Sequence, residues 1–242
     1  MQARPNVVLI EHTPDPTNVV AAAGRLCYSS ADIEALREKV SAADQTKYVS
    51  MLRRLGHLST FEHVSFTFGI EGVSRALLAQ ITRHRIASFS VQSQRYVGQS
   101  GEDGFDYIVP PAIEALGEEK AARFREQMAQ MDAWYRQWLE ELGEGGKEDA
   151  RFVLPNAAAT RMVVTMNARE LTHFFALRCC NRAQWEIREV AWQMLRLAHG
   201  VAPALFDDCG PACLRGACPE GKMCCGRMDE VRARYLSEIG GR

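Results

Sequence analysis

The residues that most suggest chemistry are the basic run Arg83-His84-Arg85 and, a little further along the chain, Ser93 and Arg95. They lie in a thirty-residue window, 72–101, that contains four Arg and one His but no Asp or Glu. Positive charge without a partner is costly to hold near a protein core, so we expect an anion from outside the chain to neutralise it. Guanidinium groups bind phosphate oxygens in a planar, bidentate manner, which favours a phosphate ligand.

A second window without acidic residues covers 150–169 and contains Arg151, Arg161 and Arg169. Arg178 and Arg182 follow, and their spacing of four places both on one face of a helix. Any one of these arginines taken alone fits a solvated helix face better than a ligand site. Two separate arginine-rich windows, each beside a strand that looks buried, favour a ligand with more than one phosphate.

The usual phosphate-binding loops are missing, because the chain has neither GxxxxGK[ST] nor a strand-linked GxGxxG. A bound nucleotide must therefore be held by Arg and His side chains and by helix N-termini. His57 and His63 lack the spacing of a zinc pair, so we expect no metal at these residues. Ser93 lacks the G-x-S-x-G elbow of a nucleophile, and a hydrogen-bonding role suits it better.

The composition bounds the class of protein. The 242 residues include 29 basic and 30 acidic side chains, for a net charge of -1. This balance argues against a general nucleic-acid binder. The sequence contains no signal-peptide pattern and no apolar run of membrane length, so we expect a cytoplasmic protein that does not bind membranes. In that compartment the eight Cys are expected to be reduced thiols or metal ligands.

Five of the eight Cys crowd into seventeen residues near the C-terminal end. They are Cys209, Cys213, Cys218, Cys224 and Cys225. Their gaps do not match the paired CxxC pattern of a zinc site, so zinc or iron–sulfur ligation and a flexible reduced tail both stay open. We expect one catalytic domain over 1–206 and a Cys-rich tail over 207–242.

Hydrophobic periodicity predicts a few strands among many helices. The alternation from Val64 to Ile70 is typical of a half-buried strand, and the apolar stripe from Ile187 to Ala198 is typical of a long helix. We also predict strands over 6–10 and 160–166, helices over 73–82 and 168–180, and a loop over 88–100. Because helices and strands do not alternate regularly, we predict an α+β fold: a single domain with a small, mostly antiparallel sheet flanked by long helices.

The spacing of Arg83-His84-Arg85, seven residues and then Ser93 resembles the signature of the flavin-dependent thymidylate synthases. Six further segments are similar to that family, in its order: HLSTFEHVSFTF at 57–68, QRY at 94–96, YIVPP at 107–111, RFVLP at 151–155, MNAREL at 166–171 and LR…AQWEI at 177–187. The resemblance covers most of residues 1–205 and is highly specific. It does not include the Cys-rich tail.

The resemblance implies a methyltransferase that converts dUMP to dTMP by reductive methylation. It implies that 5,10-methylenetetrahydrofolate donates the one-carbon unit and that FAD, reduced by NADPH, donates the hydride. No enzyme Cys then needs to attack the pyrimidine. The task of the protein is to hold the three ligands in contact and to stabilise negative charge that develops on the uracil.

The resemblance also carries over site residues by position. The implied dUMP contacts are Gln80, Arg83, Gln92, Ser93, Gln94, Arg95, Arg151 and Arg178. Among them Arg95 and Arg151 would clamp the phosphate, and Arg178 and Ser93 would be the catalytic residues, with Arg178 facing the uracil edge. The implied FAD contacts are His57, Ser59, Glu62, Arg83, His84, Arg85, Asn167, Arg169 and His173.

The family forms homotetramers whose subunits share active sites, so the resemblance implies that these two residue sets come from different chains. Three positions depart from the commonest family pattern. Gln92 stands where many members have Glu, His173 where many have Asn, and Arg182 where many have His. The first departure removes a carboxylate, and the other two alter the expected flavin and folate contacts.

Two rival functions stay open on the sequence. The same arginines, with Phe89 and Tyr96 as stacking platforms, could serve a module that binds single-stranded nucleic acid. Alternatively, Cys179 or Cys180 could act as a thiolate nucleophile in a thymidylate synthase of the other kind, with Arg178 lowering the thiol pKa. We expect no nucleic-acid partner, because the net charge is balanced, and we expect helical Cys to be core residues.

Overall fold

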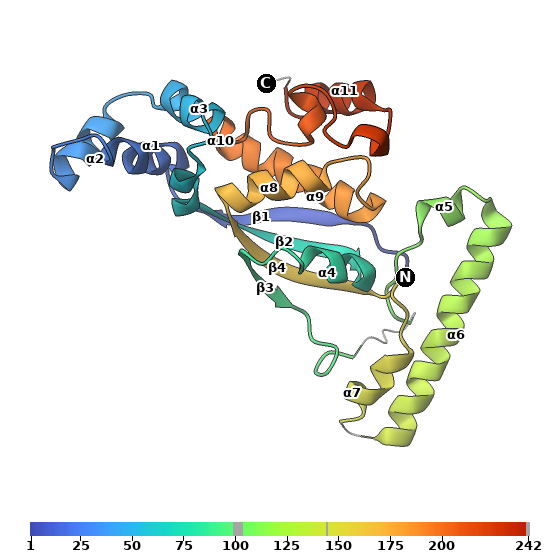
Figure 1. Cartoon of the computed structure of the whole chain (residues 1–242). Coiled ribbons are helices and arrows are strands. Elements are labelled where there is room, and N and C mark those ends of the chain that lie inside the picture. Colours follow the sequence, from blue (N-terminus) through green and yellow to red (C-terminus); the bar gives the residue numbers. More distant parts are fainter. Residues whose placement is uncertain (99–103, 144, 241–242) are drawn as a thin grey trace. The chain divides into compact units, whose positions relative to one another are not determined.

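The computed structural model describes residues 1–98, 104–143 and 145–240. Its four strands form one antiparallel sheet in the order β1-β2-β4-β3 (Figure 1). The strands are β1 (Asn6–His12), β2 (Ser65–Ser74), β3 (Ala87–Val91) and β4 (Ala159–Asn167). Together with the many helices, this sheet confirms the predicted α+β fold.

Helices precede, separate and follow the strands along the sequence. The α-helices are α1 (Pro16–Leu26), α2 (Ile33–Ser41), α3 (Thr46–Arg54), α4 (Arg75–Ile81), α5 (Pro111–Glu114), α6 (Glu118–Leu142), α7 (Lys147–Ala150), α8 (Ala168–Arg178), α9 (Trp185–Val201), α10 (Pro203–Phe206) and α11 (Met228–Glu238). Short 3-10 turns are η1 (Leu58–His63), η2 (Arg151–Val153), η3 (Ala212–Leu214) and η4 (Gly221–Met223). No helix of the described residues is long and apolar enough to cross a bilayer.

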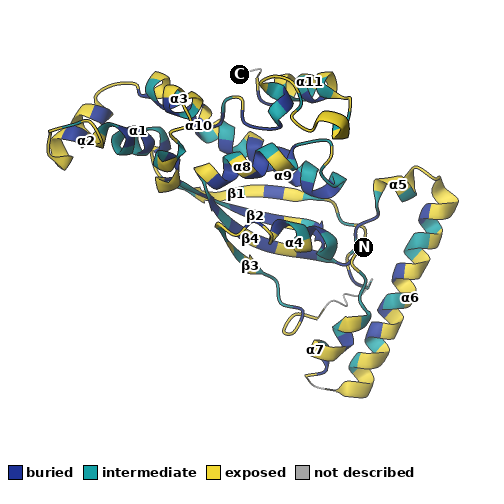
Figure 2. Ribbon diagram, viewed as in Figure 1, coloured by how far each residue is buried: buried dark blue, intermediate teal, exposed yellow. Residues whose placement is uncertain are grey.

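The chain divides into two compact units. The first unit comprises 1–6, 70–83 and 89–163, and the second comprises 7–69, 84–88 and 164–242. In the first unit, Met128 of α6 forms a buried apolar cluster with Phe105 and Ala158. In the second unit the ring of Phe206 packs edge-on against Phe66 and Phe175, with centroids 5.3 and 5.9 Å apart. Figure 2 shows buried residues alternating with partly or fully exposed ones along β4.

The strands follow the predicted periodicity, with one exception in the predicted loop. In β2 the side chains of Phe66, Phe68 and Ile70 are buried and the residues between them are partly exposed, as expected. The predicted loop over 88–100 is wrong at its start, because β3 covers Ala87–Val91. Ala87, Phe89 and Val91 do alternate with Ser88 and Ser90, which is the period of a strand, and the strand pairs with β4. Residues 99 and 100 of that loop lie outside the described residues.

Local capping sets the ends of the two helices that matter for the site. In α8 the Asn167 side chain accepts a hydrogen bond from the Glu170 N–H at 2.8 Å. Glu170 lies in the first turn and Arg178 in the last, the arrangement that the helix dipole favours. In α4 the Ser74 hydroxyl accepts from the Leu77 N–H at 3.0 Å, so the helix begins at Arg75, two residues later than predicted.

The tail is folded in the part that the structure describes, residues 207–240. The Arg234 guanidinium lies 4.7 Å from the ring centroid of Trp192 and donates to Glu189 at 2.8 Å. The Tyr235 hydroxyl accepts from the Asp208 N–H at 2.9 Å. The flexible-tail alternative is therefore wrong for 207–240, because α11 has polar and aromatic partners on α9. The domain boundary at 206 stays a prediction. Within the described residues no three His, Cys, Asp or Glu are grouped to hold a metal ion.

Gly72 offers a test of the backbone geometry in the first unit. Its φ is +65°, and a Cβ there would lie 2.0 Å from the Arg4 carbonyl oxygen. We predict that Gly72→Ala lowers the free energy of unfolding by about 2–4 kcal/mol, because a left-handed conformation and a backbone clash add. Urea unfolding measures this change.

Gly200 is the matched control, since a Cβ there would meet nothing within 4 Å and its residue lies in α9. Gly200→Ala should raise stability by about 0.5–1 kcal/mol through helix propensity. Equal unfolding midpoints for the two variants would contradict the geometry described for Gly72.

Candidate active site

Arginines gather around one glutamate in the first unit. Arg95 Nε donates to Glu148 Oε2 at 2.7 Å, and Arg151 Nε donates to the Glu148 backbone carbonyl at 2.8 Å. Burial and the nearby charge of Arg151 lower the pKa of Arg75. Two guanidinium groups thus contact Glu148, and the charge of Arg151 acts on a third, that of Arg75. We call Arg75, Arg95, Glu148 and Arg151 the arginine cluster, and its surplus positive charge favours an anion.

The arginines of the two acid-free windows are not all without partners in the chain. Arg95 pairs with Glu148, 53 residues away, and in the second unit Arg169 pairs with Glu62, 107 residues away. The expectation that these two arginines lack internal counter-charges is wrong, because sequence windows do not reveal distant acids. Arg83 and Arg85 are exposed, and within the described residues no side-chain hydrogen bond or ion pair engages either.

The other predicted nucleotide contacts in the first unit follow β3. The Ser93 hydroxyl accepts from the Arg95 N–H at 3.2 Å, which fixes the turn after the strand. With its amide oxygen turned toward Arg161, Gln92 accepts from Nη2 at 2.9 Å and from Nε at 3.1 Å. Gln94 is buried. Gln80 lies on α4 and donates to a backbone carbonyl of that helix at 3.3 Å.

In the second unit, two predicted site residues, His84 and Arg178, form a chain of hydrogen bonds with Glu170. The chain is buried at its Glu170 end and partly buried at Arg178. His84 Nδ1 lies 2.8 Å from Glu170 Oε1, and Arg178 Nε donates to His84 Nε2 at 3.1 Å. Arginine is always a donor, so Nε2 must be the acceptor and the ring proton must sit on Nδ1. The Nδ1–H then donates to the Glu170 carboxylate. We call Glu170, His84 and Arg178 the buried triad.

The neutral form of His84 is favoured inside this chain. Burial lowers the pKa of His84 below its ordinary value, the hydrogen bond to Glu170 raises it, and the charge of Arg178 lowers it further, with a net lowering. The ring also packs edge-on against Phe174, with centroids 4.9 Å apart. Because the pKa of His84 is lowered on folding, the neutral ring contributes its full stability to the fold above about pH 6.5, the pKa of an ordinary histidine. This contribution to stability is lost as the pH falls through the pKa of the folded state.

The remaining predicted cofactor contacts lie around η1 and α8 of the second unit. His57, Ser59 and Glu62 are exposed on or beside η1. Asn167 caps α8, so its side-chain oxygen already has a structural hydrogen bond. The exposed His173 ring lies 6.1 Å from the His84 ring, centroid to centroid. Arg169, at the start of α8, pairs with Glu62 of η1, so the two elements meet there.

Cys179 is unsuited to nucleophilic attack. Its side chain is fully buried, and this burial raises the pKa of the thiol well above the ordinary value. A thiol that is neutral and inaccessible is a poor nucleophile. The finding argues against the thiolate alternative at this residue and agrees with the expectation that it is a core residue.

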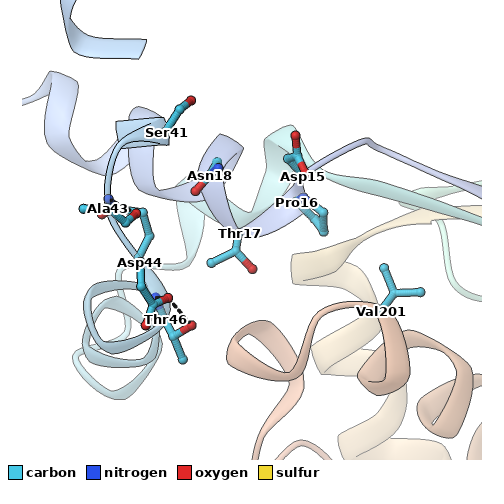
Figure 3. Close-up of a pocket in the computed structure, with 10 residues that line it drawn as sticks. Asp15, Pro16, Thr17, Asn18, Ser41, Ala43, Asp44, Thr46 and Val201 are labelled. Carbon is cyan, nitrogen blue, oxygen red and sulfur yellow. Dashed lines mark hydrogen bonds between the residues drawn. The ribbon is translucent and has the colours of Figure 1, made fainter. Parts of the chain in front are cut away.

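A polar pocket of about 440 Å³ lies elsewhere in the second unit (Figure 3). Its lining residues are Asp15, Pro16, Thr17, Asn18, Ser41, Ala43, Asp44, Gln45, Thr46 and Val201. Hydrogen bonds from the Thr46 hydroxyl and N–H lower the pKa of Asp44, which keeps this carboxyl charged. No predicted site residue lines the pocket. Because carboxylates repel phosphates, this pocket is a poor site for a nucleotide.

Sequence reasoning missed three residues that contact the predicted ones or lie within reach of their charge. They are Arg75, Glu148 and Glu170, and a fourth, Arg161, was named in the second acid-free window but was given no role. Glu170 stands inside the quoted MNAREL segment, but its position three residues after Asn167 signals helix capping and says nothing of His84. Arg75 belongs to the first acid-free window and could have been named on that ground alone.

The sequence matches the family model described as thymidylate synthase complementing protein over residues 8–204. It is 55% identical over 229 residues to the flavin-dependent thymidylate synthase of Geobacter sulfurreducens, covering 95% of this chain and 97% of that one. It is 40% identical over 220 residues to the enzyme of the same name from Pyrococcus furiosus, covering 88% and 89%.

Two proteins of known structure have a similar fold. Thymidylate synthase X from Helicobacter pylori, solved with FAD and dUMP, has a TM-score of 0.62 at 26% identity and covers 85% of this chain and 98% of its own. The UMP/dUMP methylase PolB from Streptomyces cacaoi, bound with 5-Br dUMP, has a TM-score of 0.70 at 24% identity. It covers 85% of this chain and 94% of its own.

The arginine cluster predicts how one substitution changes anion binding. In Glu148→Gln, the side chain keeps its size but no longer neutralises Arg95, so inorganic phosphate should bind about 3–10-fold more tightly. Phosphate titration followed by calorimetry at fixed ionic strength measures the affinity. Glu34→Gln, which removes an exposed pair with Arg37, is the control and should bind phosphate like the wild type. Weaker binding in Glu148→Gln would contradict an anion site at the cluster.

Proposed function

The chain belongs to the flavin-dependent thymidylate synthase family, and we propose on this premise which of its residues carry the reaction. The reaction is the reductive methylation of dUMP to dTMP, with 5,10-methylenetetrahydrofolate as one-carbon donor. NADPH reduces the flavin. The observation that carries the assignment of residues is the arginine cluster, because a surplus of guanidinium groups beside one carboxylate suits a nucleotide phosphate.

The dUMP phosphate binds to Arg95 and Arg151 in this proposal. Arg95 exchanges the Glu148 carboxylate, 2.7 Å away, for a phosphate oxygen, and Arg151 keeps its contact with the Glu148 carbonyl while its remaining N–H groups face the phosphate. A phosphate dianion is the stronger partner, since it accepts from both guanidinium groups at once. Arg83, Gln80, Gln92, Ser93 and Gln94 complete the predicted dUMP contacts.

The residues present fit FAD. Arg83 and Arg85 are exposed cations that engage no side chain of the described residues, as a pyrophosphate ligand requires. Arg85, with His57, Ser59, Glu62, Asn167, Arg169 and His173, would hold the cofactor. FAD, when bound and reduced, supplies the hydride. The side chains around it exclude water and fix its orientation.

Arg178 and Ser93 act on the pyrimidine. Arg178 faces the uracil edge and stabilises negative charge that develops on its carbonyl oxygen, where a guanidinium in a dry site contributes most. Ser93 hydrogen-bonds the nucleotide and positions it. Cys179 takes no part, since its thiol is buried and neutral. The chain's own residues therefore bind, orient and stabilise charge, and the one-carbon transfer needs no protein nucleophile.

The wider assembly is part of the proposal. We propose a homotetramer with shared active sites, in which the dUMP set and the FAD set come from different chains. Folate and NADPH are the co-substrates. A cytoplasmic location and the absence of nucleic-acid or membrane partners stay predictions.

An anaerobic tritium-release assay tests the function. The purified protein should be yellow and should release tritium from 5-tritiated dUMP when methylenetetrahydrofolate and NADPH are both present. dTMP should form in equal amount. A colourless protein that neither binds dUMP nor releases tritium would overturn the proposal.

Arg151→Ala tests the phosphate clamp. Loss of a bidentate, charge-assisted contact should raise the KM for dUMP about 10–100-fold and change kcat much less, because phosphate binding serves ground state and transition state alike. Steady-state kinetics under anaerobic conditions measure both constants. Arg37→Ala, at an exposed pair, should match the wild type. An unchanged KM in Arg151→Ala would remove this residue from the dUMP site.

A further inference from the structure

Glu170 is a buried glutamate for which the proposed function names no role. It is 7% exposed, and its partner His84 is 6% exposed. Burying a carboxyl group costs free energy unless hydrogen bonds compensate for the lost water. The Glu170 carboxylate accepts a hydrogen bond from His84, whereas the Glu170 backbone N–H donates to the Asn167 cap. The buried carboxylate therefore serves the imidazole and not the helix cap.

The buried triad spans α8 from its first turn to its last residue. Glu170 and Arg178 are eight residues apart in the helix, about 12 Å along its axis. The His84 ring comes from the segment between α4 and β3 and contacts both side chains, 2.8 Å from Glu170 and 3.1 Å from Arg178. Phe174, one turn after Glu170, packs edge-on against the ring and restricts its rotation.

The direction of the hydrogen bonds in the triad is set at both ends, by the Arg178 donor at Nε2 and by the Glu170 carboxylate at Nδ1. A neutral imidazole can carry its proton on either nitrogen. The carboxylate accepts only from a donor, so it holds the proton on Nδ1 and keeps the Nε2 lone pair aimed at Arg178 Nε–H. Without that carboxylate the ring can take the Nε2–H form, which would place two N–H groups against each other and displace the guanidinium.

We propose that Glu170 is a positioning residue for Arg178, acting through His84 to hold the guanidinium in one orientation. This inference rests on the proposed function, in which Arg178 faces the uracil of dUMP. It also gives His84 a role other than the predicted flavin contact, because both ring nitrogens are already engaged. Glu170 itself touches neither substrate nor cofactor.

The proposal predicts a specific pH dependence. The charged or titratable groups that face His84 are Glu170, His173 and Arg178, all on α8, with Arg83 and Arg85 beside it in its own segment. Protonated His84 cannot accept from Arg178, so kcat should fall as the pH drops through the lowered pKa of His84. Glu170 raises that pKa, so Glu170→Gln should move the acid limb to lower pH.

A double-mutant cycle on the FAD-loaded enzyme tests the coupling. Glu170→Gln should lower kcat for dTMP formation about 10-fold and leave the KM for dUMP within about 2-fold, as for other supporting residues. In an Arg178→Ala background, which is itself strongly impaired, Glu170→Gln should change kcat less than about 2-fold, because the residue it positions is gone. An equal loss in both backgrounds would overturn the proposal.

His84 variants separate positioning from packing. His84→Gln keeps an acceptor near the Nε2 position and should retain kcat within about 5-fold, with an acid limb that no longer shifts when Glu170→Gln is added. His84→Leu removes the acceptor and should lose about 100-fold. Equal losses in His84→Gln and His84→Leu, with flavin content lowered in both, would show that His84 serves the flavin and would overturn the proposal.

Asp132→Asn is the matched control for neutralising a buried carboxylate. Asp132 is 9% exposed and accepts from Arg136 at 2.6 Å, in the first unit. Asp132→Asn should lower the unfolding midpoint and leave the pH profile of kcat unchanged.

Different results would overturn the proposed function and the present inference. An Arg178→Ala enzyme with wild-type turnover would overturn the catalytic role of Arg178 and this inference with it, whereas an impaired Arg178→Ala without coupling to Glu170 would overturn this inference alone.

Discussion

The hydrogen-bond chain from Glu170 through His84 to Arg178 is the interaction on which the rest of the site depends. It joins the two ends of α8 through a ring supplied by the segment after α4, and all three polar groups are buried or partly buried. Charge in a dry environment acts more strongly than charge in water, but it must be held in place by other bonds. The chain supplies those bonds and leaves the fold with a single favoured proton position.

Positive charge has two different roles in this protein. In the first unit the arginine cluster keeps more cations than acids, which suits a ligand that brings its own negative charge. In the second unit Arg178 has an internal acceptor, and Arg169 has an acidic partner. A guanidinium that binds a phosphate can have an internal partner that the phosphate replaces. In the proposed site, a guanidinium that faces a uracil edge needs an internal partner that stays in place. In the proposed reaction, an exchangeable acidic partner at Arg95 would serve binding and the fixed acceptor at Arg178 would serve chemistry.

Local patterns predicted the elements whose burial follows the sequence period. The alternation in β2 and the stripe on α9 both correspond to buried faces. The strand β3 was missed although Ala87, Phe89 and Val91 alternate with exposed Ser, because it is only five residues long and its partner β4 is distant in the sequence. Glu148 and Glu170 were missed for the same reason: an ion pair over 53 or 86 residues leaves no local trace. The arginine windows indicated phosphate, and the family motifs indicated which phosphates.

Nitrogen NMR of the His84 ring tests the central claim most directly. In protein labelled with ¹⁵N at histidine and assigned with His84→Gln, the account predicts a neutral imidazole at pH 7 with its proton on Nδ1, and a titration midpoint below that of an ordinary histidine. In Glu170→Gln that proton should lose its fixed position. A His84 that is cationic at pH 7, or that carries its proton on Nε2, could not accept from Arg178 and would contradict the account.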